Sequence, residues 1–192
     1  MRGQAHTLEA FVAAVLIVGG LIFATQATAV TPLSASTSNQ HIENQQRATI
    51  QGLLATSAES GTLTEAVLYW NASAGRFQGA SGDDAYATAP PNAFGSALRE
   101  TLSERRIAFN VDVRYATGGG TATEPMVWMG EPSDNAVTAT ETVGLYNSSE
   151  LTGADARTLS AVDRSGDDFY APNVHDGRLY NVVEVEVTAW RK

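Results

Sequence analysis

The sequence contains no cysteine, and its single lysine is the terminal Lys192. Without cysteine the chain has no disulfide framework, no thiolate nucleophile and no cysteine-ligated zinc or iron–sulfur site, so packing must hold the fold together. The chain has eleven arginines and one lysine but 21 acidic residues, which gives a net charge of −9. Because phosphate binding requires clustered basic side chains, this balance excludes nucleic acid as a partner.

The length of 192 residues corresponds to one folded domain. The acidic excess, with arginine in place of lysine, is typical of a halophilic protein, although a GC-rich genome would also favour arginine. In 1 M salt the Debye length is about 3 Å, so the surface acidity would then serve solubility and not recognition.

Motifs for catalysis or metal binding are missing as well. None of the three histidines, His6, His41 and His175, has a partner at metal-ligand spacing, and no nucleophile elbow, Walker A or HExxH motif occurs. The acidic stretch 163–168, followed by Asp176, lacks the spacing of an EF-hand and is interpreted as a solvated loop. We therefore expect no enzymatic activity, no cofactor and no metal.

One long apolar run is present near the amino end. Residues 10–24 contain no polar side chain, and Leu8 and residues 25–30 extend the run at lower hydrophobicity. A helix over 8–30 would be about 34 Å long, enough to cross a hydrocarbon core of about 30 Å. The run therefore predicts a membrane-spanning helix. A buried core helix and a cleaved secretory signal, with its A-x-A site at 27–29, are the alternatives.

The residues before this run are Arg2, Gly3, Gln4 and Ala5. A basic residue and a small residue directly ahead of an apolar helix resemble the class III leader of archaeal type IV pilins and archaellins. The stretches GEPSDNAV, FYAP and LYNVVEVEV also resemble an uncharacterised pilin-like family of halophilic archaea. The resemblance implies a leader peptidase that cuts after Gly3 or Gln4, so that the mature chain begins at Gln4 or Ala5, and a pilus assembly machinery as partner.

The same resemblance gives Glu9 a role in assembly. In type IV pilins a glutamate near the mature amino terminus neutralises the free amine of a neighbouring subunit. It is commonly the fifth mature residue, and Glu9 is fifth after a cut at Gln4 but sixth after a cut at Gly3. The alternative is a glutamate at a helix amino end that the macrodipole favours without any partner.

The charges flanking the apolar run predict the orientation. Arg2 precedes it, and the next basic residue is Arg47, so the positive-inside rule places the amino terminus in the cytoplasm and the head outside the cell membrane. The sequons at Asn71 and Asn147 are candidate glycosylation acceptors on that outer side.

Beyond residue 31 the periodicity predicts an α+β head. Apolar residues recur at helical spacing from 42 to 54 after an interruption at 34–39. Thr62 opens a capping box for a short helix, residues 71–92 are predicted to form a loop, and Asn92 is the predicted cap of a further helix.

Four segments predict the strands of an antiparallel sheet. Apolar and polar residues alternate along the first and the last, the second is short, and the third is rich in threonine and valine. The four segments are residues 107–115, 125–129, 136–146 and 182–190. The predicted fold is thus a long amino-terminal helix, its first half membrane-spanning, followed by a four-stranded sheet, as in type IV pilins. The predicted segments are a leader 1–3, a transmembrane or filament-core helix 4–30, its continuation 31–60 and an extracellular head 61–192.

Two functions follow from this organisation. The leading one is a pilin-like structural subunit that is anchored in the membrane before it assembles with other pilin-like subunits into a filament or its base complex. The alternative is a membrane-anchored binding module that never polymerises.

Overall fold

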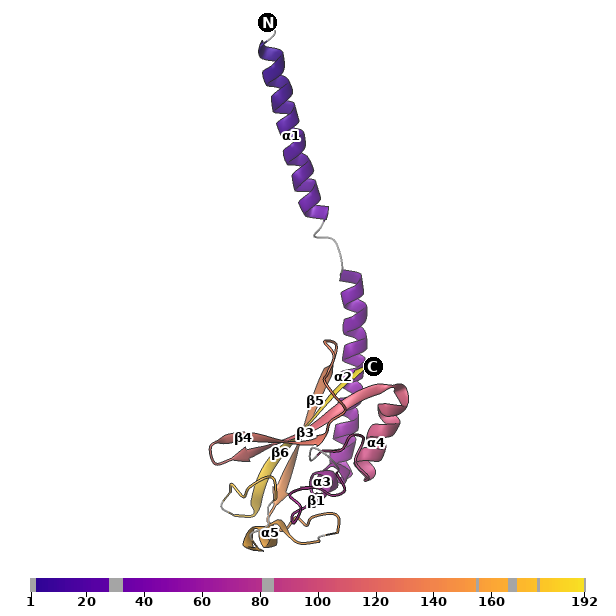
Figure 1. Ribbon diagram of the computed structural model, residues 1–192, viewed down its shortest axis with the longest axis vertical. Helices are drawn as coiled ribbons and strands as arrows, with labels where there is room; N and C mark the ends of the chain where they lie inside the picture. Colours follow the sequence, from indigo (N-terminus) through magenta and orange to yellow (C-terminus); the bar gives the residue numbers. More distant parts are fainter. Residues whose placement is uncertain are drawn as a thin grey trace. The chain divides into compact units, whose positions relative to one another are not determined.

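The computed structural model describes residues 3–27, 33–80, 85–154, 156–165, 169–175 and 177–191 (Figure 1). The chain divides into two compact units, Met1–Ile42 and Glu43–Lys192. The first unit contains α1 (Gly3–Ala27) and the start of α2 (Leu33–Glu59). The second unit contains the rest of α2 and all of the described strands.

The structure corrects the predicted fold class and localisation at the amino end. In the part of the chain that the structure describes, no helix combines the length and the apolarity needed to cross a membrane. The predicted spanning helix over 4–30, the single-pass localisation and the extracellular placement of the head that depended on it are therefore wrong. The prediction added weakly apolar flanks to a strictly apolar run of fifteen residues, 10–24, whereas a spanning helix needs about 20.

α2 runs without the interruption that the sequence predicts. The stretch 34–39 is helical, so the predicted interruption there is wrong; it contains neither glycine nor proline, the two residues that most strongly disfavour a helix. Ile50 and Leu54 lie one turn apart in α2 and are fully buried, which confirms the second part of the predicted apolar stripe, whereas Ile42 at its start is 38% exposed.

The main layer of the second unit is a four-stranded antiparallel sheet with the order β4-β3-β6-β5. Its strands are β3 (Ile107–Thr117), β4 (Gly120–Val127), β5 (Val137–Tyr146) and β6 (Leu179–Arg191). β4 begins five residues earlier than predicted, because pairing resumes directly after the tight turn, with Thr117 opposite Gly120.

The predicted inner face of this sheet is confirmed by the strand register. Val111 pairs with Val187 and Val113 with Val185, and all four side chains are fully buried. Side chains from α2, α3 and α4 belong to the same core cluster, so these helices cover this face (Figure 1). The opposite face of the sheet is called the outer face below.

Short elements connect α2 to the sheet and precede β6. They are α3 (Thr62–Val67), β1 (Trp70–Asn71), β2 (Arg76–Phe77), α4 (Ala93–Thr101), a 3₁₀ turn η2 (Ser103–Arg105) and α5 (Leu159–Ser165). β1 and β2 form a second, two-stranded sheet that begins one residue before the predicted loop 71–92 and continues into it.

The two predicted helix caps have different outcomes. The side chain of Asn92 accepts a hydrogen bond from Gly95 N–H at 2.9 Å, as predicted for the start of α4. The capping box at Thr62 is wrong. Gly61 is the cap of α3, with a φ of 79° and no side-chain hydrogen bond, a backbone conformation that glycine adopts without steric cost.

Candidate interaction surfaces

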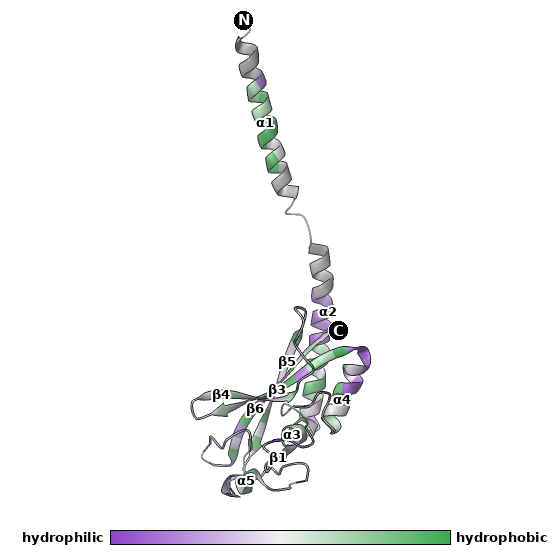
Figure 2. Cartoon of the chain, viewed as in Figure 1, coloured by the Kyte–Doolittle hydropathy of each residue, from purple (hydrophilic) through white to green (hydrophobic). Residues whose placement is uncertain are grey.

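α1 carries most of the exposed large apolar side chains among the described residues. Eight of them are between 48% and 71% exposed: Phe11, Val12, Val15, Leu16, Ile17, Val18, Leu21 and Ile22. Figure 2 shows this stretch as the apolar part of α1. Because successive residues of an α-helix are about 100° apart, these eight side chains point in all directions around the helix. A helix that is apolar on every side is normally buried.

A shallow hollow interrupts this apolar surface beside Gly19. Its lining consists of Ala14, Val15, Val18, Gly19 and Ile22. At Gly19 and Gly20 no atom lies within 4 Å of where a Cβ would stand. The helix backbone is therefore open to close approach by a neighbouring element.

The predicted assembly and cleavage residues lie at the amino end of α1. Glu9 is exposed and stands two residues before Phe11, the first large side chain of the apolar surface. Gly3, Gln4 and Ala5 begin the helix, and their side chains lie outside the described residues, as does residue 2. The cleavage site and the role of Glu9 stay predictions.

The two sequon asparagines differ in their surroundings. Asn71 lies in β1, and its side-chain oxygen accepts a hydrogen bond from Ala74 N–H at 3.0 Å. The side-chain nitrogen of Asn147 donates a hydrogen bond to the Gly177 carbonyl, and its oxygen accepts one from Asn173 at 3.2 Å. The side-chain nitrogen that a glycan would occupy is thus already engaged at Asn147. Glycosylation at either position stays a prediction.

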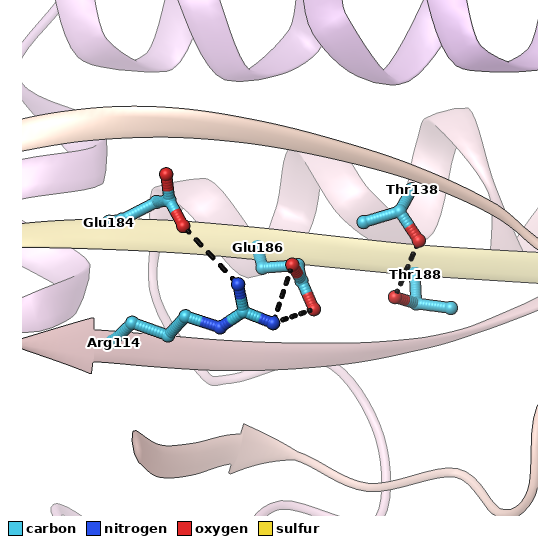
Figure 3. Close-up of polar contacts among 5 residues, drawn as sticks. All are labelled: Arg114, Thr138, Glu184, Glu186 and Thr188. Atoms are coloured by element: carbon cyan, nitrogen blue, oxygen red, sulfur yellow. Dashed lines mark hydrogen bonds and ion pairs between the residues drawn. The ribbon is translucent and has the colours of Figure 1, made fainter. Parts of the chain in front are cut away.

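The outer face of the sheet carries a row of charged side chains from β3 and β6. The Arg114 guanidinium lies 3.6 Å from a carboxylate oxygen of Glu184 and 3.0 Å from one of Glu186. Figure 3 shows Arg114 reaching from β3 to both carboxylates of β6. Beyond them on β6, the hydroxyl of Thr188 lies 3.1 Å from that of Thr138 on β5.

A third carboxylate joins this row. Asp112 stands directly opposite Glu186 in the β3–β6 pairing. Burial raises the pKa of the Asp112 carboxyl, and the Arg114 guanidinium acts in the opposite direction. We call Asp112, Arg114, Glu184 and Glu186 the acidic row, because three carboxylates and one guanidinium give it a net charge of −2 when all are ionised. Sequence reasoning did not identify it, since only the strand register brings β3 and β6 together.

The exposed aromatic side chains are few. Trp70 and Trp190 are buried, with 3% and 5% exposed, whereas Trp128 and Tyr146 are 47% and 50% exposed. Asn110 anchors the chain beside Trp128, because its side chain accepts a hydrogen bond from Met129 N–H at 2.8 Å and donates one to the Gly130 carbonyl at 3.0 Å.

The predicted acidic loop is partly helical. α5 extends to Ser165, and the Asp163 carboxylate accepts a hydrogen bond from the Tyr180 hydroxyl at 2.7 Å. Residues 166–168 and Asp176 lie outside the described residues. Among the residues that are described, no group of three or more histidines or carboxylates is placed to hold a metal ion.

Comparison with known proteins gives one finding. Residues 2–189 match a family of unknown function, DUF7288, so the chain belongs to that family. No curated protein and no solved structure matches it.

Proposed function

We propose that the chain is a pilin-like structural subunit. In this proposal, copies of the chain assemble into a type IV pilus-like filament, or into a complex at its base, with the α1 helices buried against one another. The observation that carries the proposal is the all-round exposure of apolar side chains on α1, where Leu16 and Ile17 are 70% and 68% exposed.

The distribution of these side chains favours several neighbours over one. A helix with a single apolar stripe is covered by one partner, as in a dimer, but α1 is apolar on opposite sides. Covering one such side chain contributes about 1.5 kcal/mol or more. Only a helix that is surrounded by others gains this contribution on every side, which is the arrangement of a filament core.

Glu9 fits this arrangement as the charged end of the apolar surface. A carboxylate that is carried into a shared helix core needs a compensating charge. The amino terminus of a neighbouring copy, created by cleavage after Gly3 or Gln4, supplies that charge in the proposal. The leader peptidase and the assembly machinery are then the partners of the chain before assembly.

The proposal is tested by charging opposite sides of α1. Leu16 and Val18 are two residues apart and therefore point about 160° away from each other. We expect Leu16→Glu and Val18→Glu each to abolish self-association of the full chain, measured by sedimentation velocity. Ile42→Glu, an exposed apolar residue of α2, is the matched control and is expected to associate normally.

Two other outcomes would contradict the proposal. Sensitivity to only one of the two substitutions indicates a one-sided contact and contradicts the surrounded helix. A wild-type chain that stays monomeric at all concentrations overturns the proposal and favours the non-polymerising binding module.

A further inference from the structure

A basic corner lies at one end of the four-stranded sheet. Arg105 and Arg106 are exposed where η2 meets β3, and Arg191, also exposed, is the register partner of Ile107 at the end of β6. We define the basic corner as Arg105, Arg106 and Arg191. None of the three forms a side-chain ion pair with another described residue. In a chain of net charge −9, such a concentration of unpaired cations is an exception.

The backbone of Arg106 is a second, independent observation. Its φ of 59° makes it the one non-glycine residue with positive φ among those the structure describes. This left-handed conformation is common for glycine at the end of a helix, but it costs conformational free energy for a residue with a Cβ. Arginine therefore occupies this position at a cost in conformational free energy that glycine would avoid. Backbone strain of this kind is concentrated at functional positions.

The acidic row is the complementary surface. Within one copy the two surfaces cannot meet, because Arg106, directly before β3, and Asp112 are six residues apart, about 20 Å in an extended strand. The side chains of Arg114 and Glu184 are 48% and 41% exposed, so a cation from outside has access to the row. The guanidinium of Arg114 contacts both Glu184 and Glu186, but its single positive charge offsets only one of the three negative charges of the row.

We infer that the basic corner of one copy docks on the acidic row of the next copy. This inference rests on the proposed function, in which α1 brings the copies together. Chains of charge −9 repel one another, and a contact between these two surfaces offsets that repulsion where the heads meet. High salt removes long-range steering, but oppositely charged groups in direct contact are screened much less.

The two surfaces differ, so the contact is head-to-tail. A contact of this kind leaves one basic corner and one acidic row unused at the ends of every open oligomer. It therefore propagates into a ring or an open filament and does not stop at a symmetric dimer. This property distinguishes the inferred contact from a self-complementary one, and it agrees with the many-neighbour packing proposed for α1.

Charge reversal in the full chain tests the contact. We expect Arg106→Glu to weaken self-association about tenfold in sedimentation velocity, and Glu184→Arg to do the same. The double variant Arg106→Glu/Glu184→Arg restores attraction with the signs exchanged and is expected to recover most of the loss. Arg76→Glu makes the same charge change at an exposed residue of β2 and is the matched control.

The outcomes separate the two proposals. Absence of self-association in the wild-type chain contradicts the proposed function itself. Normal association of the wild type, combined with equal effects of Arg106→Glu and Arg76→Glu or with no recovery in the double variant, overturns the docking contact and leaves the proposed function standing. Thermal unfolding of each variant is expected to stay cooperative with only a small shift in Tm, since the substituted side chains are exposed, and this shows that the differences arise in assembly and not in folding.

Discussion

At the scale of single residues, the side chain of Asn181 makes hydrogen bonds to β3 where the backbone pairing of β3 with β6 has ended. It is fully buried, its side-chain oxygen accepts a hydrogen bond from Ala116 N–H at 3.1 Å, and its nitrogen donates to the carbonyls of Ala116 and Pro172 at 2.9 and 2.7 Å. The register between β3 and β6 extends only to Tyr115 opposite Val183. The amide therefore continues the contact between the two strands and fixes the segment before β6.

We expect Asn181→Leu to destabilise the chain strongly. Leucine has a similar size but removes the hydrogen bonds to the partly buried backbone of Ala116 and to the Pro172 carbonyl, which costs about 1 to 3 kcal/mol. Urea unfolding measures the loss. The matched control is Asn173→Leu at an exposed position, where the side chain makes two long hydrogen bonds, to Asn147 at 3.2 Å and from His175 N–H at 3.4 Å. There the change should stay within about 0.5 kcal/mol. Equal losses would show that Asn181 does not fix the strand ends.

The buried tyrosines predict how stability depends on alkaline pH. Burial raises the pKa of Tyr86, Tyr170 and Tyr180, and the hydrogen bond to Asp163 raises that of Tyr180 further. The unfolded chain ionises its tyrosines near pH 10, whereas the folded chain resists ionisation. The free energy that the neutral tyrosines contribute to stability is thus fully present below about pH 10 and falls as the pH rises above it.

A parallel titration checks this dependence. We expect the phenolate absorbance of the three buried tyrosines to appear together with the loss of the far-ultraviolet circular dichroism signal. Ionisation of all tyrosines while the circular dichroism spectrum stays native would contradict the burial of these hydroxyls. Tyr86→Phe removes one of the three groups and should reduce the alkaline sensitivity.

At the scale of elements, the strand faces were predictable from alternation alone. Val183, Val185 and Val187 are fully buried in β6, and Glu184 is half-exposed between them. Such alternation is local information, since one residue along a strand reverses the side chain. Features that depend on two distant segments were not predictable in this way. The acidic row depends on the β3–β6 register, and the start of β4 depends on how tightly the chain turns after Thr117.

The helix caps also show how far the sequence pattern predicts the structure. Asn92 caps α4 as predicted because its side chain reaches a backbone N–H three residues on. At α3 the same kind of pattern failed, since the Thr62 hydroxyl donates instead to the Ser57 carbonyl at 3.2 Å. The left-handed backbone of Gly61 already turns the chain from α2 into α3. Two helices joined without a loop leave no place for a capping box.

The register is tested by comparing neighbours in β6. We expect Val185→Ala to lower the free energy of unfolding by about 1 to 3 kcal/mol through lost burial and a residual cavity. Glu184→Ala removes a solvent-exposed ion pair with Arg114 at 3.6 Å and should cost less than about 1 kcal/mol. Denaturant unfolding at matched salt measures both. Similar losses would contradict the assignment of inner and outer faces.

At the scale of the whole molecule, α2 connects the two units and belongs to both. The division falls between Ile42 and Glu43, and from residue 40 onward the first fully buried side chain of α2 is Ile50. Farther along, the side chain of Gln51 donates a hydrogen bond to the Thr140 carbonyl of β5 at 3.3 Å. Because β5 is an edge strand, this contact occupies a backbone group that would otherwise be open to another chain. The second half of α2 is therefore part of the folded head.

This division predicts different behaviour for two fragments. The fragment 43–192 keeps Ile50 and Leu54, both fully buried, and we expect it to unfold cooperatively in urea. It lacks α1, so under the proposed function it should sediment as a monomer or only weakly associated species.

The fragment 62–192 loses both side chains from the core. Since removing one such side chain costs about 2 to 5 kcal/mol, and a domain is stable by only about 5 to 15 kcal/mol, we expect this fragment to be largely unfolded. Native-like stability of 62–192 would show that α2 is not part of the head, and strong self-association of 43–192 would place the main assembly contact outside α1.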